Sequence, residues 1–147
     1  MNTKFYRHIA TLFGLGYSKY VPGTLGSLAG LGLCLLLHGY FFVYVGVFIA
    51  LFSAGVISSR IMEDASGEKD PSFIIIDEFA CVFIVFLSVP ITPLTLISGF
   101  AVYRLVDIFK IPPLKLLERQ KGGWGIMLDD LAAAVYANLI LRTFALL

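Results

Sequence analysis

Five long apolar segments, separated by short polar breaks, make up most of this chain. The segments cover residues 25–37, 40–57, 73–89, 94–109 and 126–147. They lack the regular apolar–polar alternation of barrel strands, and open strand edges are not tolerated in lipid. The pattern therefore predicts an all-α fold, a compact helical integral membrane protein with about five membrane-associated helices.

The lengths of the segments are uneven. A membrane-spanning helix needs about 20 apolar residues, within a range of about 17 to 25. Segments 40–57, 94–109 and 126–147 reach or nearly reach this length, whereas 25–37 is short. Segment 73–89 is also short once Asp77 is taken as its start. We expect three to five embedded helices, with the short ones tilted, half-buried or re-entrant.

Composition favours the same class. Of the 147 residues, 59% are hydrophobic and 14% are charged, whereas a soluble domain carries about 25% charged residues. The length suits one domain, which we take as residues 1–147. A net charge of +1 gives no electrostatic basis for binding nucleic acid. Cys34 and Cys81 lie inside apolar segments, where buried small hydrophobes are expected.

The charged residues gather on one side if the five segments alternate in direction. That side receives residues 1–24, 60–76 and 110–125 together with the neighbouring segment ends. It then holds all ten acids and ten of the eleven Lys and Arg residues, with Arg142 opposite. An excess of Lys and Arg marks the cytoplasmic side. We therefore expect a multi-pass protein of the inner (cytoplasmic) membrane, with a polar site facing the cytoplasm.

Five acids are expected to converge in that site. They are Asp77 and Glu78 in the third segment, Asp107 in the fourth, and Asp129 and Asp130 in the fifth. Carboxylates near a membrane are costly and usually mark function, and clustered carboxylates repel unless a cation joins them. Oxygen ligands without Cys or His favour Mg²⁺. A purely structural alternative, stabilisation of a helix N-terminus, explains one acid better than it explains five.

The glycine-rich stretch at residues 22–27, PGTLGS, opens the first apolar segment. Its free backbone N–H groups and the hydroxyls of Thr24 and Ser27 are candidates for binding a phosphate. The alternative is an ordinary helix N-cap by Thr24, which is the better explanation when the stretch is considered alone.

Four cations accompany the acids: Arg104, Lys110, Lys115 and Arg119. Cations beside carboxylates and a metal suit a phosphate ester. The alternative is a basic loop resting on anionic lipid headgroups. Arg104 and Lys110 bracket Asp107 on one helical face, and Lys115 and Arg119, four residues apart, would share another.

Taken together, these motifs resemble the phosphatidylglycerophosphatase A family of membrane lipid phosphatases. The matching pieces are GLG at 14–16, PGTLGS at 22–27, IDEF at 76–79, RLVDIFK at 104–110 with Pro113, and GGWGIMLDD at 122–130. The resemblance implies Mg²⁺-dependent removal of the terminal phosphate of phosphatidylglycerophosphate, which gives phosphatidylglycerol. It also implies that the acidic site positions are Asp77, Glu78, Asp107, Asp129 and Asp130.

Three positions depart from the family pattern. The chain has Lys110-Ile111-Pro112-Pro113 where the family tends to show Lys-Pro-x-Pro, and it has Cys81 and Ala134 where the family often has glycine. These changes affect helix packing and loop shape and leave the charged groups in place. They therefore bear on geometry and substrate range more than on reaction class.

We hypothesise that the carboxylates hold Mg²⁺, that one acts as general base, and that Thr24, Ser27 and the four cations hold the phosphate of a phospholipid. An aspartyl-phosphate formed on Asp107 or Asp129 is the alternative route. A CDP-alcohol phosphotransferase is a rival, but its acids lie on one helix, whereas here they are spread over three. A small transporter is a second rival, and it predicts charges spread through the membrane depth. A soluble helical protein with a large core is the third.

Overall fold

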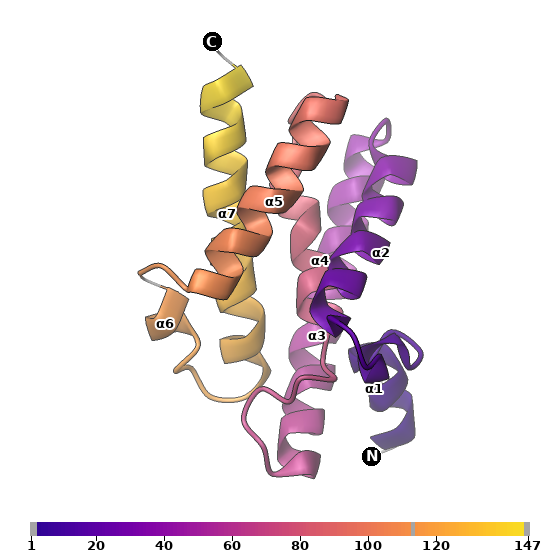
Figure 1. Ribbon diagram of the computed structural model, residues 1–147. Coiled ribbons are helices and arrows are strands. Elements are labelled where there is room, and N and C mark those ends of the chain that lie inside the picture. Colours follow the sequence, from indigo (N-terminus) through magenta and orange to yellow (C-terminus); the bar gives the residue numbers. More distant parts are fainter. Residues whose placement is uncertain (1–2, 113, 146–147) are drawn as a thin grey trace.

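The computed structural model describes residues 3–112 and 114–145, and over this range it contains helices and no strands (Figure 1). The predicted all-α class is confirmed. In chain order the elements are α1 (Thr3–Ala10), the 3₁₀ helix η1 (Leu15–Tyr17), α2 (Pro22–Leu37), α3 (Phe41–Ser66), α4 (Ile76–Val85), α5 (Pro93–Phe109), α6 (Leu114–Leu117) and α7 (Gly123–Ala145).

Each of the five predicted apolar segments forms most of one of the longer helices: α2, α3, α4, α5 and α7. Among the described residues, α3 and α7 are long and apolar enough to cross a membrane, and α2 is a shorter apolar helix. Pro113 and the last two residues of the predicted fifth segment, 146–147, lie outside the described residues. Residues 1–24, predicted as a polar arm, include α1 and η1.

The predicted boundary at the end of the second apolar segment was wrong. Residues 60–66 were expected in a charged loop, but α3 continues through them to Ser66 and ends at Gly67, whose φ of 71° terminates the helix. Met62 lies on the buried face of this last part of α3, in line with Ser58 and Ser59. The helical spacing of these buried positions, three and four residues apart, outweighs the charged residues on the other faces.

The exposure of α3 is informative. In the 18-residue stretch of α3 that is apolar enough to cross a membrane, only 17% of the residues are buried. Side chains such as Phe42, Val43 and Ile49 are exposed. Apolar surface on this scale is not maintained in water. The arrangement favours lipid around α3 over the soluble-protein alternative.

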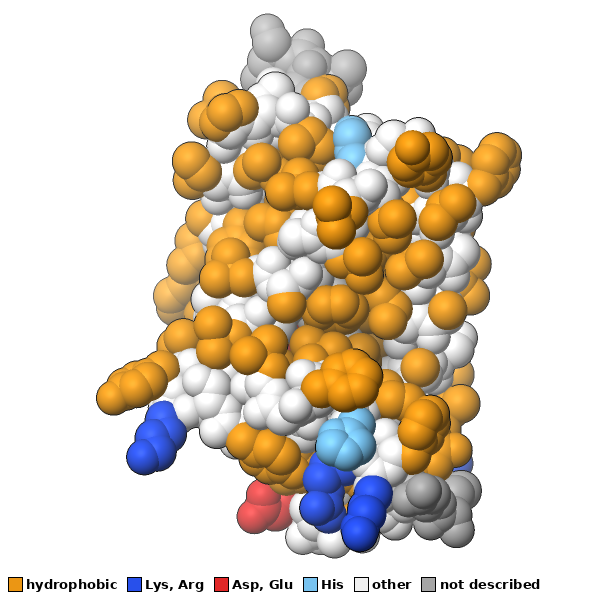
Figure 2. Space-filling model, turned by 90° about the vertical axis from the view of Figure 1, so that its right-hand side faces the viewer, with side chains coloured by type: hydrophobic (Ala, Val, Ile, Leu, Met, Phe, Trp, Pro, Cys, Tyr) orange, Lys and Arg blue, Asp and Glu red, His pale blue; other side chains and the backbone are white. Residues whose placement is uncertain are grey.

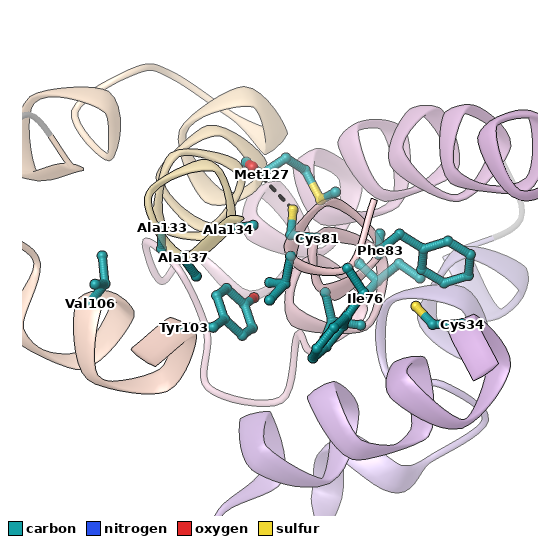
Figure 3. Close-up of a cluster of buried hydrophobic side chains, with 14 of the residues drawn as sticks. Cys34, Ile76, Cys81, Phe83, Tyr103, Val106, Met127, Ala133, Ala134 and Ala137 are labelled. Carbon is teal, nitrogen blue, oxygen red and sulfur yellow. Dashed lines mark hydrogen bonds between the residues drawn. The ribbon is translucent and has the colours of Figure 1, made fainter. Parts of the chain in front are cut away.

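The short helix α4 lies at the centre and contacts α2, α3, α5 and α7. Its residues from Ala80 to Phe83 are fully buried. Figure 3 shows Cys81 of α4 on the side of Tyr103 of α5 and the small residues Ala133, Ala134 and Ala137 of α7, whereas Phe83 lies on the other side of α4, toward Cys34 of α2. The Cys81 thiol donates to the carbonyl oxygen of Met127 at 3.7 Å. Both cysteines are free and buried, as predicted.

The C-terminal end of α4 is capped by side chains from distant helices. Tyr44 Oη donates to Phe83 O at 2.5 Å, and Asn138 Nδ2 donates to Val85 O and Leu87 O at 3.0 and 3.1 Å. Arg142 donates to Leu87 O and to the Asn138 side chain. These bonds satisfy carbonyls that the helix leaves unpaired, so the chain can leave the helix within an apolar environment.

The polar connections lie together at one end of the molecule. In Figure 1 the N-terminus, the α3–α4 connection and α6 lie at the bottom, while the α2–α3 turn, the α4–α5 turn and the end of α7 lie at the top. Figure 2 shows one face, on which apolar side chains cover the middle and Lys and Arg gather at the lower end. The alternating arrangement expected from the sequence is therefore present, and it brings the charged segment ends together.

Candidate functional site

A pocket of about 420 Å³ at the polar end is lined by all five predicted acids. The start of α2 forms one wall, and the α3–α4 connection with the first turn of α4 forms another. The end of α5 and the second turn of α7 complete it. We call it the acidic pocket; its charged and hydroxyl-bearing residues are Thr24, Asp70, Ser72, Asp77, Glu78, Arg104, Asp107, Lys110, Asp129 and Asp130.

Three of the acids form a tight cluster. Asp77, Glu78 and Asp130 each present a carboxylate oxygen, and these oxygens lie within 4.8 Å of one another. Asp77 and Asp130 are 7% and 4% exposed. Among the described residues, Asp77 Oδ1 and Glu78 Oε2 are buried without a hydrogen-bond partner. Buried carboxylates this close repel each other, and an all-oxygen donor set with unused lone pairs fits a hard divalent cation.

Arg104 joins three of the helices around the pocket. Its Nη1 atom lies 2.9 Å from Asp107 Oδ2 and 3.8 Å from Glu78 Oε1. The same Nη1 donates to Ser27 Oγ at 3.3 Å. The guanidinium therefore sits between the carboxylates and the start of α2, where an anionic ligand in the pocket would meet it.

Lys110 holds the opposite side of the pocket. Its Nζ atom lies 3.0 Å from Asp129 Oδ2 and 3.1 Å from Glu118 Oε1. Partial burial lowers the pKa of Lys110, but the two carboxylates outweigh it, and the net pKa lies above the usual value. The residue ends α5 with a φ of 44°, a left-handed conformation that is unfavourable for a lysine. Such local strain is typical of functional sites.

Asp129 and Asp130 are adjacent in α7, but their side chains line different sides of the acidic pocket. Asp129 Oδ1 accepts the backbone N–H of Asp130 at 3.1 Å, while its Oδ2 faces Lys110. Asp130 instead joins the cluster with Asp77 and Glu78. Adjacent helical residues point about 100° apart, so one pair of acids supplies two sides of the pocket.

The glycine-rich start of α2 lets this helix approach the acids closely. A methyl group at Gly23 would collide with Glu78 Oε1, and one at Gly30 would collide with Phe79 O. α2 begins at Pro22 with Val21 as the N-cap residue, so Thr24 is not the N-cap that the alternative reading required. Thr24 lines the pocket, whereas Ser27 is fully buried behind it and donates to Gly23 O.

Two predicted phosphate ligands lie away from the pocket. Lys115 is exposed on α6, which has only four residues, and Arg119 follows the end of that helix. The two therefore do not share the helical face that their spacing predicted. Arg119 lines a separate surface depression with Glu63, Asp64 and Glu68.

The sequence reasoning missed three polar groups that the fold brings in. Asp70 and Ser72 line the pocket from the α3–α4 connection, and Glu118 pairs with Lys110. The signal for the first two was available, because Asp70-Pro71-Ser72 directly precedes the segment that carries Asp77. Glu118 opens the short polar run 118–121, where nothing local distinguishes it from its neighbours.

Comparison with known proteins gives a consistent family. The model of the family described as Phosphatidylglycerophosphatase A matches residues 8–145. Proteins named Phosphatidylglycerophosphatase A from Haemophilus influenzae and Escherichia coli are 36% and 32% identical. Each alignment covers 90% of this chain, with 83% and 79% of the respective relative. A Bacteroides thetaiotaomicron protein provisionally named phosphatidylinositol-3-phosphatase is 34% identical over 90% of this chain and 89% of its own.

No solved structure matches the chain at a significant level.

Proposed function

Because the chain belongs to the phosphatidylglycerophosphatase A family, we propose that it hydrolyses the terminal phosphate monoester of phosphatidylglycerophosphate. The products are phosphatidylglycerol and inorganic phosphate. The observation that carries the proposal is the acidic pocket, where three clustered carboxylates face two cations at the polar end of an apolar helical bundle. This combination suits a phosphate ester whose acyl chains remain in lipid.

Mg²⁺ is the proposed cofactor, and Asp77, Glu78 and Asp130 would hold it. Their oxygens are close together, and two of them have unused lone pairs in the described structure. When bound, the ion supplies positive charge that stabilises the phosphate in the transition state and promotes ionisation of the attacking water. Asp77 and Glu78 come from α4 and Asp130 comes from α7, so the same site links two helices.

The phosphate would be held by the cations across the pocket. Arg104 can offer a planar pair of N–H donors, and Lys110 a single charge. Thr24 adds a hydroxyl from the start of α2. Ser27 acts on Arg104, since its Oγ accepts from the guanidinium. Lys115 and Arg119, which lie outside the pocket, we assign to anionic headgroups at the membrane surface.

Asp107 and Asp129 remain for proton transfer or attack, because they lie outside the three-carboxylate cluster. Each is held by a cation, Asp107 by Arg104 and Asp129 by Lys110. We favour removal of a proton from water by one of them. The competing route is attack by the carboxylate itself. Acid quenching of a turnover mixture with radiolabelled substrate separates the two, because only the second leaves label on the protein.

The lipid would reach the pocket from the bilayer. Ile108 lines the pocket and is exposed, and the neighbouring Leu105 on α5 is also exposed. Leu28 on α2 is exposed as well. Acyl chains lying along this apolar surface would leave the headgroup at the polar end. The distribution of Lys and Arg supports a cytoplasmic orientation of this end in the inner membrane.

Phosphate release by purified protein in detergent tests the proposal. Phosphatidylglycerophosphate and phosphatidylinositol-3-phosphate are supplied in parallel, each with Mg²⁺ and with EDTA. We expect Mg²⁺-dependent release that is faster from phosphatidylglycerophosphate. Faster release from phosphatidylinositol-3-phosphate would instead make that lipid the substrate, in line with the name of the Bacteroides relative. Absence of release from both, by folded protein, would overturn the reaction class.

A further inference from the structure

A second groove lies on the outer surface where α7 begins beside α3. It has a volume of about 810 Å³ and shares no lining residue with the acidic pocket. Four apolar side chains form its wall and two cations lie at its polar end. They are Val56, Ile57, Ile61 and Trp124, with Arg60 and Lys121. We call it the α3–α7 groove.

Two glycines bring the cations together. Gly123 has no room for a side chain, because a methyl group there would collide with Val56 O and lie 2.9 Å from the backbone nitrogen of Arg60. Gly122 has a φ of 66°, which favours glycine. The backbone of α7 therefore starts directly against α3. Lys121, the residue before these glycines, lines the same groove as Arg60.

The groove straddles the border between the apolar and the polar surface. In α3, residues 41–59 carry no charge and Arg60 is the first charged residue. Trp124 packs toward the apolar part of α3, with its ring 6.3 Å from that of Phe52, and it remains 54% exposed. Tryptophan is enriched at this level of a membrane. The two cations thus lie where a phospholipid carries its phosphate, and the apolar wall lies where its acyl chain begins.

We propose that the α3–α7 groove binds one anionic phospholipid, in addition to the substrate. Within the described residues, neither Arg60 nor Lys121 is in an ion pair. Asp64 is the one acid that lines the groove, against two cations, and this excess of positive charge in the lining favours an anionic over a zwitterionic headgroup. The inference depends on the membrane location and not on the proposed reaction.

The groove is connected to the acidic pocket through the chain that precedes α7. Glu118, three residues before Lys121, pairs with Lys110, and Lys110 pairs with Asp129. A lipid phosphate bound by Arg60 and Lys121 would hold the segment from Glu118 to Lys121 against α3. An anionic lipid in the groove therefore acts as a structural ligand of the segment that positions Lys110.

Trp124 is the only tryptophan in the chain and reports directly on the groove. The experiment measures quenching of its fluorescence in mixed micelles by phosphatidylglycerol or phosphatidylcholine with brominated acyl chains. We expect the anionic lipid to quench at the lower mole fraction. The double variant Arg60→Gln/Lys121→Gln should remove this preference, with about a fivefold loss per cation, while leaving quenching by phosphatidylcholine unchanged.

The matched control is Lys4→Gln/Arg7→Gln, which removes two exposed cations from α1 and should keep the preference. Equal quenching of the original protein by the two lipids would overturn the proposal. So would retention of the preference in the groove variant, or an equal loss in the α1 control, which would indicate bulk attraction only. If the double variant fails to fold, Lys121→Gln alone tests the same point, because Lys121 is exposed in a loop.

Discussion

The acidic residues are the part of the site that sequence reasoning located best. Asp77, Glu78, Asp107, Asp129 and Asp130 were predicted to converge, and all five line one pocket. The prediction succeeded because helices that alternate in direction must bring every second set of segment ends together. Asp70, Ser72 and Glu118 were missed because they lie in connections, where the path of the chain is set by tertiary contacts.

Asp129→Asn should lower phosphate release by about 100-fold or more, the scale expected for losing a general base. The amide keeps the shape of the side chain and removes its basicity and its charge toward Lys110. Turnover under saturating substrate is the measurement, with circular dichroism to confirm folding. Lys115→Gln, an exposed cation outside the pocket, is the comparison for loss of one charge. An unchanged rate in Asp129→Asn would remove Asp129 from the mechanism.

Gly23→Ala should abolish most activity through sterics alone. A methyl group there meets Glu78 Oε1 and lies 3.2 Å from Arg104 Nη2, so both side chains must move. Gly32 is the matched control, since it lies in the same helix and an added methyl group there would meet no atom within 4 Å. Gly32→Ala should retain activity and gain up to about 1 kcal/mol of helix stability. Equal activity in the two variants would show that close packing at Gly23 has no bearing on the pocket.

At the scale of elements, the presence of the five long helices could be predicted from the sequence, but the residues at which they end could not. The apolar runs identified five helices, because long periodic runs carry a strong signal. The end of α4 at Val85 was not foreseen, since the run continues to Val89 without a local stop signal. The helix ends there because Tyr44, Asn138 and Arg142 supply hydrogen bonds from α3 and α7. Arg142, the one cation expected opposite the others, thus has a structural role.

Lys115 and Arg119 were wrongly predicted to share a helical face, and the reason is again a helix end. Their spacing of four residues would place them on one face of a long helix. The helix that forms, α6, ends at Leu117, so the geometric premise fails. Residue spacing predicts a shared face only where the helix itself is assured.

Asn138→Leu should destabilise the protein by about 2–4 kcal/mol, because it leaves the Val85 and Leu87 carbonyls with fewer donors in an apolar environment. It also removes the acceptor for Arg142 Nε. Denaturant unfolding in detergent, followed by circular dichroism, is the measurement. Leu139→Ala is the neighbouring control, since Leu139 is 56% exposed and should change stability much less. A similar cost for both substitutions would refute the capping role.

At the scale of the whole molecule, the polar site works against the stability of the bundle. Three carboxylates, of which Asp77 and Asp130 are buried and Glu78 is partly buried, present oxygens within 4.8 Å of one another between the central helices α4 and α7. Their mutual repulsion opposes the packing of these two helices. A divalent cation would convert that repulsion into a link between them, so metal binding and folding should be coupled.

Mg²⁺ should therefore raise the melting temperature of the original protein, and EDTA should lower it. At a concentration 100 times the dissociation constant, the gain is about 2.7 kcal/mol. Asp130→Asn should melt higher than the original protein in EDTA, because one repelling charge is gone, yet it should show little response to Mg²⁺ and little phosphate release. This pairing of greater stability with lost activity would not arise if Asp130 served only to hold the fold. A variant that melted lower in EDTA and still responded to Mg²⁺ would place the ion elsewhere and leave the buried carboxylates with a purely structural role.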